Sequence, residues 1–517
     1  MRSWIRFLVT DGLILASWLA SAGLVVLQGR GSLVGAVSNP SRSLGATLEA
    51  KEQWFSLSYQ GQPIGFSHAM LVPEERNGIP GVGMTDQGQL TFTLLGTPQQ
   101  LHVSARAFID ADWRLQEFAA SLQAPTYQLH WAGKRIGDKF VMTVMTPASA
   151  VTKELRDPAG GTIVTGLSSW AAFHRLHVGQ TGKAWVLNPL ALSPEPLYFT
   201  VRRLEPLDGR EALVIETDVA GLSTTSWVTP DGEVLKETSP LGWELRRTTR
   251  EEALRTQTDA ASAPDLLLAT SVPIDQHLDD PARIARLTLL VEGIEGEDIT
   301  LVRPWQRVLP PDQLAQYHRT APSGPWRLIE LTRPPTPGAA GGVPAGDVVA
   351  PVPPSSIERH RRPSPFVQSD DPRIIAKAAQ IVGARTDPWE QTVALNQWVF
   401  STLTKRLSIG LPSAVDVLLT PSGDCHEHTV LFTALARSRG IPTRMVAGLV
   451  YWQGRLYYHA WPEVWIGQWI PTDPTLGQLV ADVTHVGLIE AENEQLITLG
   501  QFIGKLRVQV VEAVTTP

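Results

Sequence analysis

The sequence predicts an α+β domain near the C-terminus, preceded by an antiparallel β-rich module and an apolar N-terminal segment. Apolar and polar residues alternate over about residues 51–260, proline and glycine dominate 333–366, and helix-like and strand-like segments follow each other over 367–490. The length of 517 residues is that of several domains. A hydrophobic content of 43% with 17 tryptophans is typical of a folded, globular protein.

Residues 1–30 have the pattern of a membrane anchor or an export signal. Arg2 and Arg6 precede an apolar run, and basic residues on that side favour export of the chain that follows. Ala20-Ser21-Ala22 fits a signal-peptidase site, but apolar residues continue through Leu27. We therefore favour an uncleaved single-pass transmembrane helix in the inner (cytoplasmic) membrane over a cleaved signal, and a buried soluble helix comes third. Either form of export leaves the bulk of the chain periplasmic.

A linker at 31–50 leads into the β-rich module expected over 51–260. Its signals are the alternating runs Phe55–Tyr59, Leu90–Leu94, Leu101–Ala105 and Tyr198–Arg202 and the hairpin turns Asp208-Gly209 and Asp231-Gly232. Many strands with few helices predict an antiparallel sheet, as a sandwich or a half-barrel.

Two segments separate this module from the α+β domain. A small β element with the strand-like run Leu287–Val291 is expected at 261–332. The proline- and glycine-rich stretch 333–366 then predicts a flexible, partly extended linker.

The α+β domain begins with three predicted helices. Helical periodicity runs over Asp370–Val382 and Asp387–Leu403, each with an aspartate before a proline at the start. A third helix is expected from Asp424 to Arg439, with Asp424 as its N-cap and a stop at Gly440.

Cys425, the only cysteine of the chain, falls in the first turn of the third helix. An intramolecular disulfide is therefore impossible, and zinc sites with two or four cysteines are excluded. A lone cysteine commonly packs as a small apolar residue. At a helix start, however, the free amides and the dipole stabilise a thiolate and can donate to an oxyanion. Packing and nucleophilic chemistry both remain open for Cys425 on this pattern alone.

Three strands are expected after this helix, over Arg444–Trp452, Leu456–Ile466 and Trp469–Asp473, with turns at Gln453-Gly454 and Gly467-Gln468. His459 lies within the second strand. A two-residue turn at Gly467-Gln468 would place Asp473 opposite Pro462, on the face away from His459. A bulge at Pro462 or Pro471 would shift the register by one residue and bring Asp473 to the other face. The register stays open.

Four stretches of the chain resemble the bacterial transglutaminase-like domain, which has a papain-related fold. They are Gly423-Asp424-Cys425, Ala434–Pro442, His459-Ala-Trp461 with Glu463-Val-Trp465, and Trp469–Thr475. The resemblance covers about residues 370–488, and Asp482-Val-Thr-His485 is similar to the close of the domain in membrane-anchored members. We take 367–490 as this domain and 491–517 as a C-terminal extension.

The resemblance implies a catalytic triad in which Cys425 is the nucleophile, His459 the base and Asp473 the residue that orients it. No cofactor is expected. His426, Glu427 and His428 do not have the spacing of a His-Glu-x-x-His zinc helix, so no metal is expected either. A net charge of −7 without a basic block argues against nucleic acid as a partner.

The implied reaction is attack of the Cys425 thiolate on an amide or isopeptide carbonyl to give a thioester. Hydrolysis is slightly favoured over acyl transfer to an amine, and the location makes an envelope protein or peptide the expected substrate. The alternatives are a catalytically silent envelope-binding module on the same fold and a metal hydrolase, which a chelator would inhibit.

Overall fold

The computed structural model describes residues 50–516, except 112–113, 125–126, 157–162, 165–175, 189–192, 220–221, 231, 240–241, 256–262, 296–298, 338–353, 407–412 and 491–495. The described chain forms two compact units, one up to Leu266 and one from Leu267 onward. The expected N-terminal transmembrane helix falls on residues 1–30, outside the described residues. Among the described helices, none has the length and apolar character needed to cross a bilayer.

The first unit is built almost wholly of β-strands, as expected. They are β1 (Lys51–Tyr59), β2 (Gln62–Arg76), β3 (Ile79–Leu94), β4 (Thr97–Asp110), β5 (Leu115–Ala124), β6 (Tyr127–Ile136), β7 (Lys139–Met145), β8 (Ala150–Arg156), β9 (Ile163–Val164), β10 (Thr181–Asn188), β11 (Ser193–Leu207), β12 (Arg210–Val219), β13 (Leu222–Val228), β14 (Val234–Thr238) and β15 (Trp243–Thr248), followed by the short helix α3 (Arg250–Arg255).

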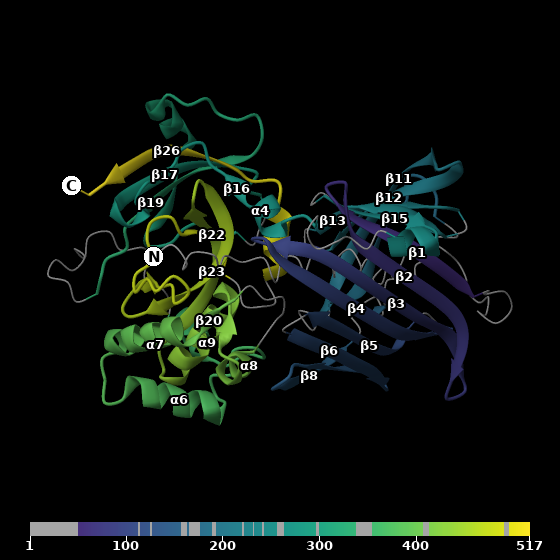
Figure 1. Cartoon of the computed structure of the whole chain (residues 1–517), viewed down its shortest axis with the longest axis horizontal. Coiled ribbons are helices and arrows are strands. Elements are labelled where there is room, and N and C mark those ends of the chain that lie inside the picture. The colour runs from purple at the N-terminus through teal and green to yellow at the C-terminus, as the bar shows by residue number, and fades with distance from the viewer. Residues whose placement is uncertain are drawn as a thin grey trace. The chain divides into compact units, whose positions relative to one another are not determined.

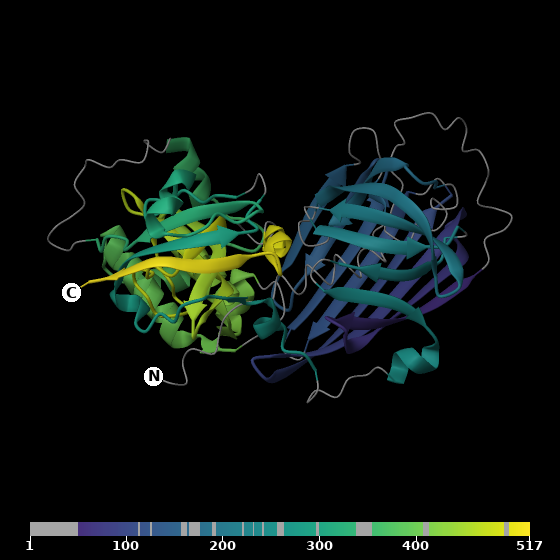
Figure 2. The same cartoon turned by 90° about the horizontal axis from the view of Figure 1, so that it is seen from above.

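Within the described residues these strands make one 15-stranded sheet in the order β8 to β1 and then β15 to β9. Neighbouring strands run antiparallel except β9 and β10, which are parallel. The sheet curves back on itself, so that strands of its two halves face each other (Figure 2). It is therefore one continuous, barrel-like sheet, closer to the expected half-barrel than to a sandwich of two sheets.

Local sequence accounts for this curved sheet. Alternate residues of β1, such as Phe55 and Leu57, are buried, which is the pattern of a strand with one face against a core. The predicted turn at Asp208-Gly209 joins β11 to β12, and both residues have positive φ, 51° and 77°. Such a turn matches the twist of the flanking strands.

The second unit combines helices with two main sheets. Its helices are α4 (Leu266–Thr270), η2 (Pro281–Arg283), η3 (Pro311–Tyr317), α5 (Pro354–Glu358), η4 (Arg359–Arg361), α6 (Pro372–Val382), α7 (Pro388–Thr402), α8 (Ala414–Leu419), α9 (Cys425–Ser438) and η5 (Leu496–Phe502). Its strands are β16 (Val272–Pro273), β17 (Ile284–Glu292), β18 (Gln306–Leu309), β19 (Trp326–Thr332), β20 (Thr404–Lys405), β21 (Ser422–Gly423), β22 (Thr443–Trp452), β23 (Arg455–Trp465), β24 (Trp469–Pro471), β25 (Val486–Glu490) and β26 (Arg507–Thr515).

The central sheet of this unit has the order β16-β23-β22-β25, with β24 also paired to β23. Helices α6 to α9 lie on one side of β22 and β23 in Figure 1, and the sheet of β17, β19 and β26 lies on the other. Asp371 and Asp387 cap α6 and α7 through their side chains, and a proline follows each, as the sequence predicted. Helix α9 is buried along nearly its whole length, so it packs on every side and not on one apolar stripe.

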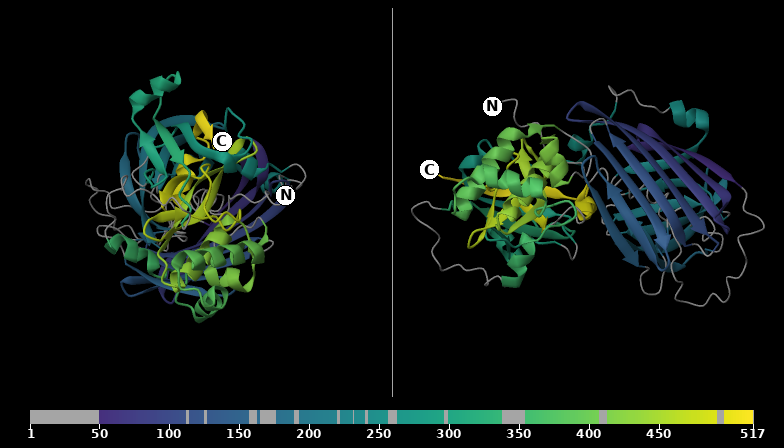
Figure 3. Two further views of the ribbon diagram at one scale, coloured as in Figure 1. Left: turned by 90° about the vertical axis from the view of Figure 1, so that its left-hand side faces the viewer. Right: turned by 90° about the horizontal axis from the view of Figure 1, so that it is seen from below.

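The second sheet joins strands from both ends of the unit, in the order β18-β19-β17-β26. The C-terminal strand β26 pairs antiparallel with β17, so the expected small β element and C-terminal extension share one sheet. Residues 354–361, expected within the flexible linker, form α5 and η4. Arg361 donates to the Gly440 carbonyl and Arg359 to Glu490, which fixes these short helices against the rest of the unit. Figure 3 shows the whole chain, with this unit included, from two further sides.

Candidate active site

Helix α9 presents Cys425 as its first residue, one position after the cap. The Asp424 side chain accepts from the His426 amide, and the Glu427 carboxylate accepts from the Asp424 amide at 2.9 Å, which completes a capping box. Gly423 makes this arrangement possible because its φ is 150° and a Cβ there would lie 2.3 Å from the Glu427 side chain. The residues around the thiol are thus held by the helix start itself.

Cys425 is fully buried against strand β23. The backbone amide of Ala460, the residue after His459, donates to Sγ at 3.2 Å, and Thr429 of α9 donates to the Ala460 carbonyl at 3.1 Å. Two bonds therefore fix β23 to α9 at the position of the thiol.

Burial, with the nearby charge of Asp424 next, raises the pKa of the Cys425 thiol well above its usual range. The Ala460 amide acts in the opposite direction. The sequence indicated that the helix start stabilises a thiolate, whereas burial of the Cys425 side chain opposes a charge on the sulfur. A neutral thiol needs a base beside it before it can attack.

The strand register brings Asp473 to the face of His459. The turn Gln453-Gly454 joins β22 to β23 as predicted, with Trp452 paired to Arg455. After β23, however, Trp465 pairs with Trp469, and Ile466 donates to Gln468, so the turn holds three residues and not two. That extra turn residue shifts the register by one, without a bulge at either proline.

His459 and Asp473 form a direct, fully buried pair. His459 Nε2 lies 2.7 Å from Asp473 Oδ2. The other ring nitrogen, Nδ1, is buried and has no hydrogen-bond partner among the described residues. The Asp473 carboxylate is fixed from behind, because Oδ1 accepts from the amides of Thr475 and Leu476 at 2.7 and 3.0 Å. His459 is thus held at one nitrogen and open at the other.

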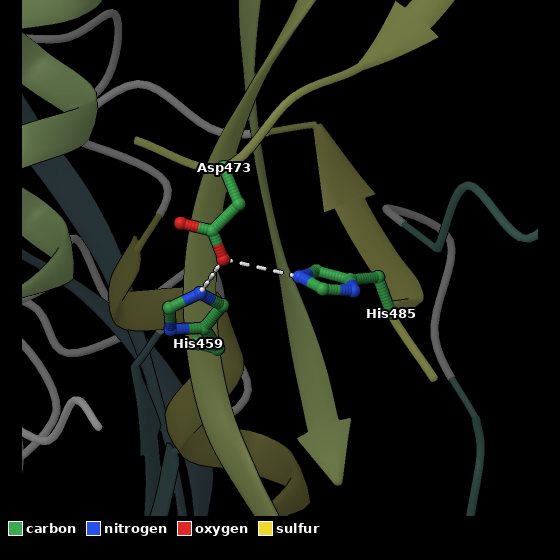
Figure 4. Close-up of side chains that lie close together, drawn as sticks. All are labelled: His459, Asp473 and His485. Atoms are coloured by element: carbon green, nitrogen blue, oxygen red, sulfur yellow. Dashed lines mark hydrogen bonds and ion pairs between the residues drawn. The ribbon is translucent and has the colours of Figure 1, made fainter. Parts of the chain in front are cut away.

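A second histidine contacts the same carboxylate oxygen and was missed as a site residue by the sequence analysis. His485 Nε2 lies 3.1 Å from Asp473 Oδ2, so Asp473 sits between two imidazoles (Figure 4). His485 Nδ1 faces Asp482, at 3.1 Å from its carbonyl and 3.3 Å from Oδ1. Asp482-x-x-His485 stood out only as a match to the end of the family's domain, and its spacing alone did not indicate a contact with Asp473.

The charges of this cluster stabilise each other. Burial alone would raise the pKa of Asp473, but the adjacent His459 and His485 lower it well below its usual range. The pKa of Asp482 is lowered as well, against the effect of burial, by its bonds to His485 and Thr484. Burial would lower the pKa of His485, yet the carboxylates of Asp473 and Asp482 raise it to about 10.

His459, Asp473 and His485 are also the group of possible metal ligands in the described part of the chain, with ligand atoms within 4.8 Å of one another. Two imidazoles and a carboxylate suit zinc or iron. Both Nε2 atoms, however, lie at hydrogen-bond distance from the carboxylate oxygen, where protons account for the contacts. His426, Glu427 and His428 do not gather into such a group; Glu427 caps α9 and His428 Nδ1 contacts the Asp424 carbonyl.

Residues 375–474 match the model of the transglutaminase-like superfamily. The C-terminal unit contains a transglutaminase-like domain. The match runs from within α6 through α9 and β23, which carries His459, to Asp473 just after β24, within the range of the sequence resemblance. No curated protein matches the chain.

Two solved structures are weakly similar to parts of the chain. A putative cysteine protease from Cytophaga hutchinsonii is 18% identical, covers 45% of this chain and 85% of its own, and has a TM-score of 0.27. A β-barrel-like protein of a domain of unknown function from Brucella abortus is 11% identical, covers 38% of this chain and 95% of its own, and has a TM-score of 0.29. Likenesses of this strength say nothing about activity.

Proposed function

We propose that the transglutaminase-like domain is a thiol enzyme that acts on amide or isopeptide bonds, with Cys425 as nucleophile, His459 as base and Asp473 as the residue that orients His459. One observation carries this assignment. His459 is fixed to Asp473 through Nε2 and keeps Nδ1 unbonded, while the neighbouring Ala460 amide holds the Cys425 sulfur. A base that is oriented at one nitrogen and open at the other, one residue before the amide that holds a thiol, supports nucleophilic catalysis.

The first half of the reaction forms a thioester. His459 Nδ1 takes the proton from Cys425 as Sγ attacks the carbonyl carbon, and the carbonyl oxygen becomes an oxyanion. The amide of Cys425 at the helix start supports that charge. His459 then gives the proton to the departing amine as the C–N bond breaks. The raised pKa of the thiol favours this concerted transfer over a thiolate formed in advance.

The second half decides between two products. Water that loses its proton to His459 releases a carboxylic acid, and the proton returns to the sulfur; an amine in place of water gives a new amide. We favour hydrolysis, because an acyl transferase needs a channel that excludes water. Trp461 and Tyr458, beside the site in sequence, are buried, which is the behaviour of core residues and not of channel walls.

Two features of this proposal come from the sequence. The N-terminal segment favours an uncleaved anchor in the inner membrane with the domain in the periplasm, and the substrate is then an envelope protein or peptide. The silent binding module stays as the alternative.

The test compares the full-length protein with Cys425→Ala on envelope fractions in the presence of a labelled primary amine. Release of fragments that depends on Cys425, without amine incorporation, is the expected result. Incorporation of the amine would overturn hydrolysis in favour of transfer. Equal behaviour of both proteins, with full complementation of a deletion strain by Cys425→Ala, would favour the binding module. Retained activity in a chelator argues against the metal hydrolase.

A further inference from the structure

We propose that His485, anchored by Asp482, is a positioning residue that fixes the Asp473 carboxylate for its contact with His459. The proposal rests on the function assigned above, since it extends the proposed triad by two residues that follow β24. His485 touches neither the thiol nor a substrate and acts through Asp473.

The contacts form an unbroken buried chain behind the histidine base. Asp473 Oδ2 is shared by His459 and His485 at 2.7 and 3.1 Å (Figure 4). His485 Nδ1 in turn faces Asp482, whose Oδ1 accepts from the Thr484 amide and hydroxyl at 2.9 and 2.6 Å. Asp482 Oδ2 accepts from Gln478 at 2.8 Å. Each acceptor along the chain is therefore fixed by a further donor.

The geometry selects the protonation state of His485. Both of its ring nitrogens face oxygen atoms that can only accept, those of Asp473 and Asp482. A neutral imidazole donates from one nitrogen, whereas an imidazolium donates from both. The raised pKa of His485 agrees with this cationic form. His485 therefore stands as a fixed positive charge between two carboxylates.

Water is kept from the cluster, which strengthens these interactions. His459, Asp473 and His485 have side chains that are 0% exposed. The Trp461 ring lies over His459 with centroids 6.0 Å apart and meets His485 edge-on at 5.1 Å. In such a low-dielectric site a second donor stabilises the Asp473 carboxylate more than it would at the surface.

The charges around Asp473 partly balance each other. The cation at His485 neutralises part of the negative charge that Asp473 places in the buried site. The charged groups that face His485 are Asp473, after β24, and Asp482, before β25; Lys405 of β20 also acts on Asp473. His485 thus fixes the carboxylate that holds His459 and balances part of its charge.

The test uses the pH dependence of alkylation of Cys425, which reads one site because the chain has a single cysteine. His485→Gln keeps a donor to Asp473 but removes the charge, and His485→Ala removes both. The control is His360→Gln, which breaks a partly buried histidine–carboxylate pair, with Glu490 at 3.3 Å, in the same unit. Iodoacetamide reacts with the full-length proteins over pH 5–10, and circular dichroism verifies their folding.

His485→Gln should move the alkylation midpoint up by about one pH unit, because loss of a nearby positive charge disfavours the Cys425 thiolate. His485→Ala should lower the rate at neutral pH further, and the glutamine variant should recover part of that loss. His360→Gln should match the wild type. If His485→Ala does not fold, the shift in His485→Gln decides.

An unchanged midpoint in His485→Gln would overturn the positioning role and leave a structural one. Failure of the proposed function would give a different result, because the alkylation midpoint would then also be unchanged in His459→Ala. If a chelator changes the pH profile of wild-type alkylation, the cluster is a metal site and not a chain of hydrogen bonds.

Discussion

At the residue scale, the centre of the site is one carboxylate with all of its bonding capacity in use. Asp473 accepts from two backbone amides through Oδ1 and contacts two histidines through Oδ2, although it is completely buried. An ionised carboxylate in a dry interior is stable only when donors and positive charge replace water. The site therefore depends on groups beyond the three residues of the proposed triad.

The charge on His485 should make the stability of the fold depend on pH. Its pKa of about 10 in the folded protein lies above the usual 6.5, so its protonation stabilises the fold fully below pH 6.5. That contribution is lost as the pH rises from 6.5 through about 10. The thermal midpoint of the wild type should therefore fall more steeply between pH 6.5 and 9 than that of His485→Gln. Parallel slopes for the two proteins would mean that His485 is neutral in the fold.

At the scale of elements, the features predicted from the sequence are helix caps and short turns, which depend on residues close together in the chain. Asp424, Asp371 and Asp387 cap their helices as expected, and the residue types at Gln453-Gly454 fix a two-residue turn. The register of β24 was not predictable, because Ile466 joins the Gly467-Gln468 turn and no local signal separates two turn residues from three.

His485 was missed as a site residue for a related reason. Its contact with Asp473 arises only because residues 474–485 fold back so that the following strand, β25, pairs with β22. A sequence pattern predicts which residues are neighbours along a helix or strand. It does not predict which histidine a loop brings into contact with a distant carboxylate. The burial of Cys425, and with it the raised pKa of its thiol, depends in the same way on β23 packing over the helix start.

The segment before β18 supports the strand that follows His485. Arg303 is buried and its Nη1 lies 3.4 Å from Glu463 of β23, while a Cβ at Gly487 of β25 would meet Arg303 Nε at 2.2 Å. Glu463 also pairs with Arg444 at 2.6 Å. The small β element thus contacts the central sheet through a buried guanidinium, in addition to the bonds of Gln306 to Gly487.

Arg303→Met should lower the free energy of unfolding of the second unit by about 3 kcal/mol, because it leaves the buried Glu463 with one cation fewer. The control is Arg307→Met, which removes a largely exposed guanidinium from the buried carboxylate of Glu330 and should cost less, about 1 kcal/mol. Denaturant unfolding of both variants measures the difference. Equal stability of the two would show that the Arg303 pair is not needed.

At the scale of the whole molecule, the second unit is closed by its last strand. Strand β26 pairs with β17, and the Val510 amide donates to Asp275 at 2.7 Å. Strands that lie on either side of residues 338–353 therefore belong to one folded unit together with the transglutaminase-like domain.

Val510→Lys should destabilise this unit by about 3 kcal/mol, because it places a charge where the side chain is 1% exposed. Val514→Lys is the matched control on the same strand, where the side chain is 37% exposed, and it should change little. Limited proteolysis during heating measures the unfolding of this unit separately from that of the β-rich unit. Similar melting of both variants would show that β26 is dispensable.

The central claim, that Cys425, His459 and Asp473 act as one catalytic unit, is tested most directly by the alkylation rate of Cys425 at pH 7. The proteins to compare are the wild type, His459→Ala, Asp473→Asn and the double variant. If all four expose the buried Cys425 equally often, that exposure cancels when each alkylation rate is divided by the wild-type rate. Each single change should slow alkylation at least about tenfold, and the double variant should be no slower than His459→Ala, because residues that act together are not additive. Rates that match the wild type, or losses that multiply in the double variant, would contradict the account.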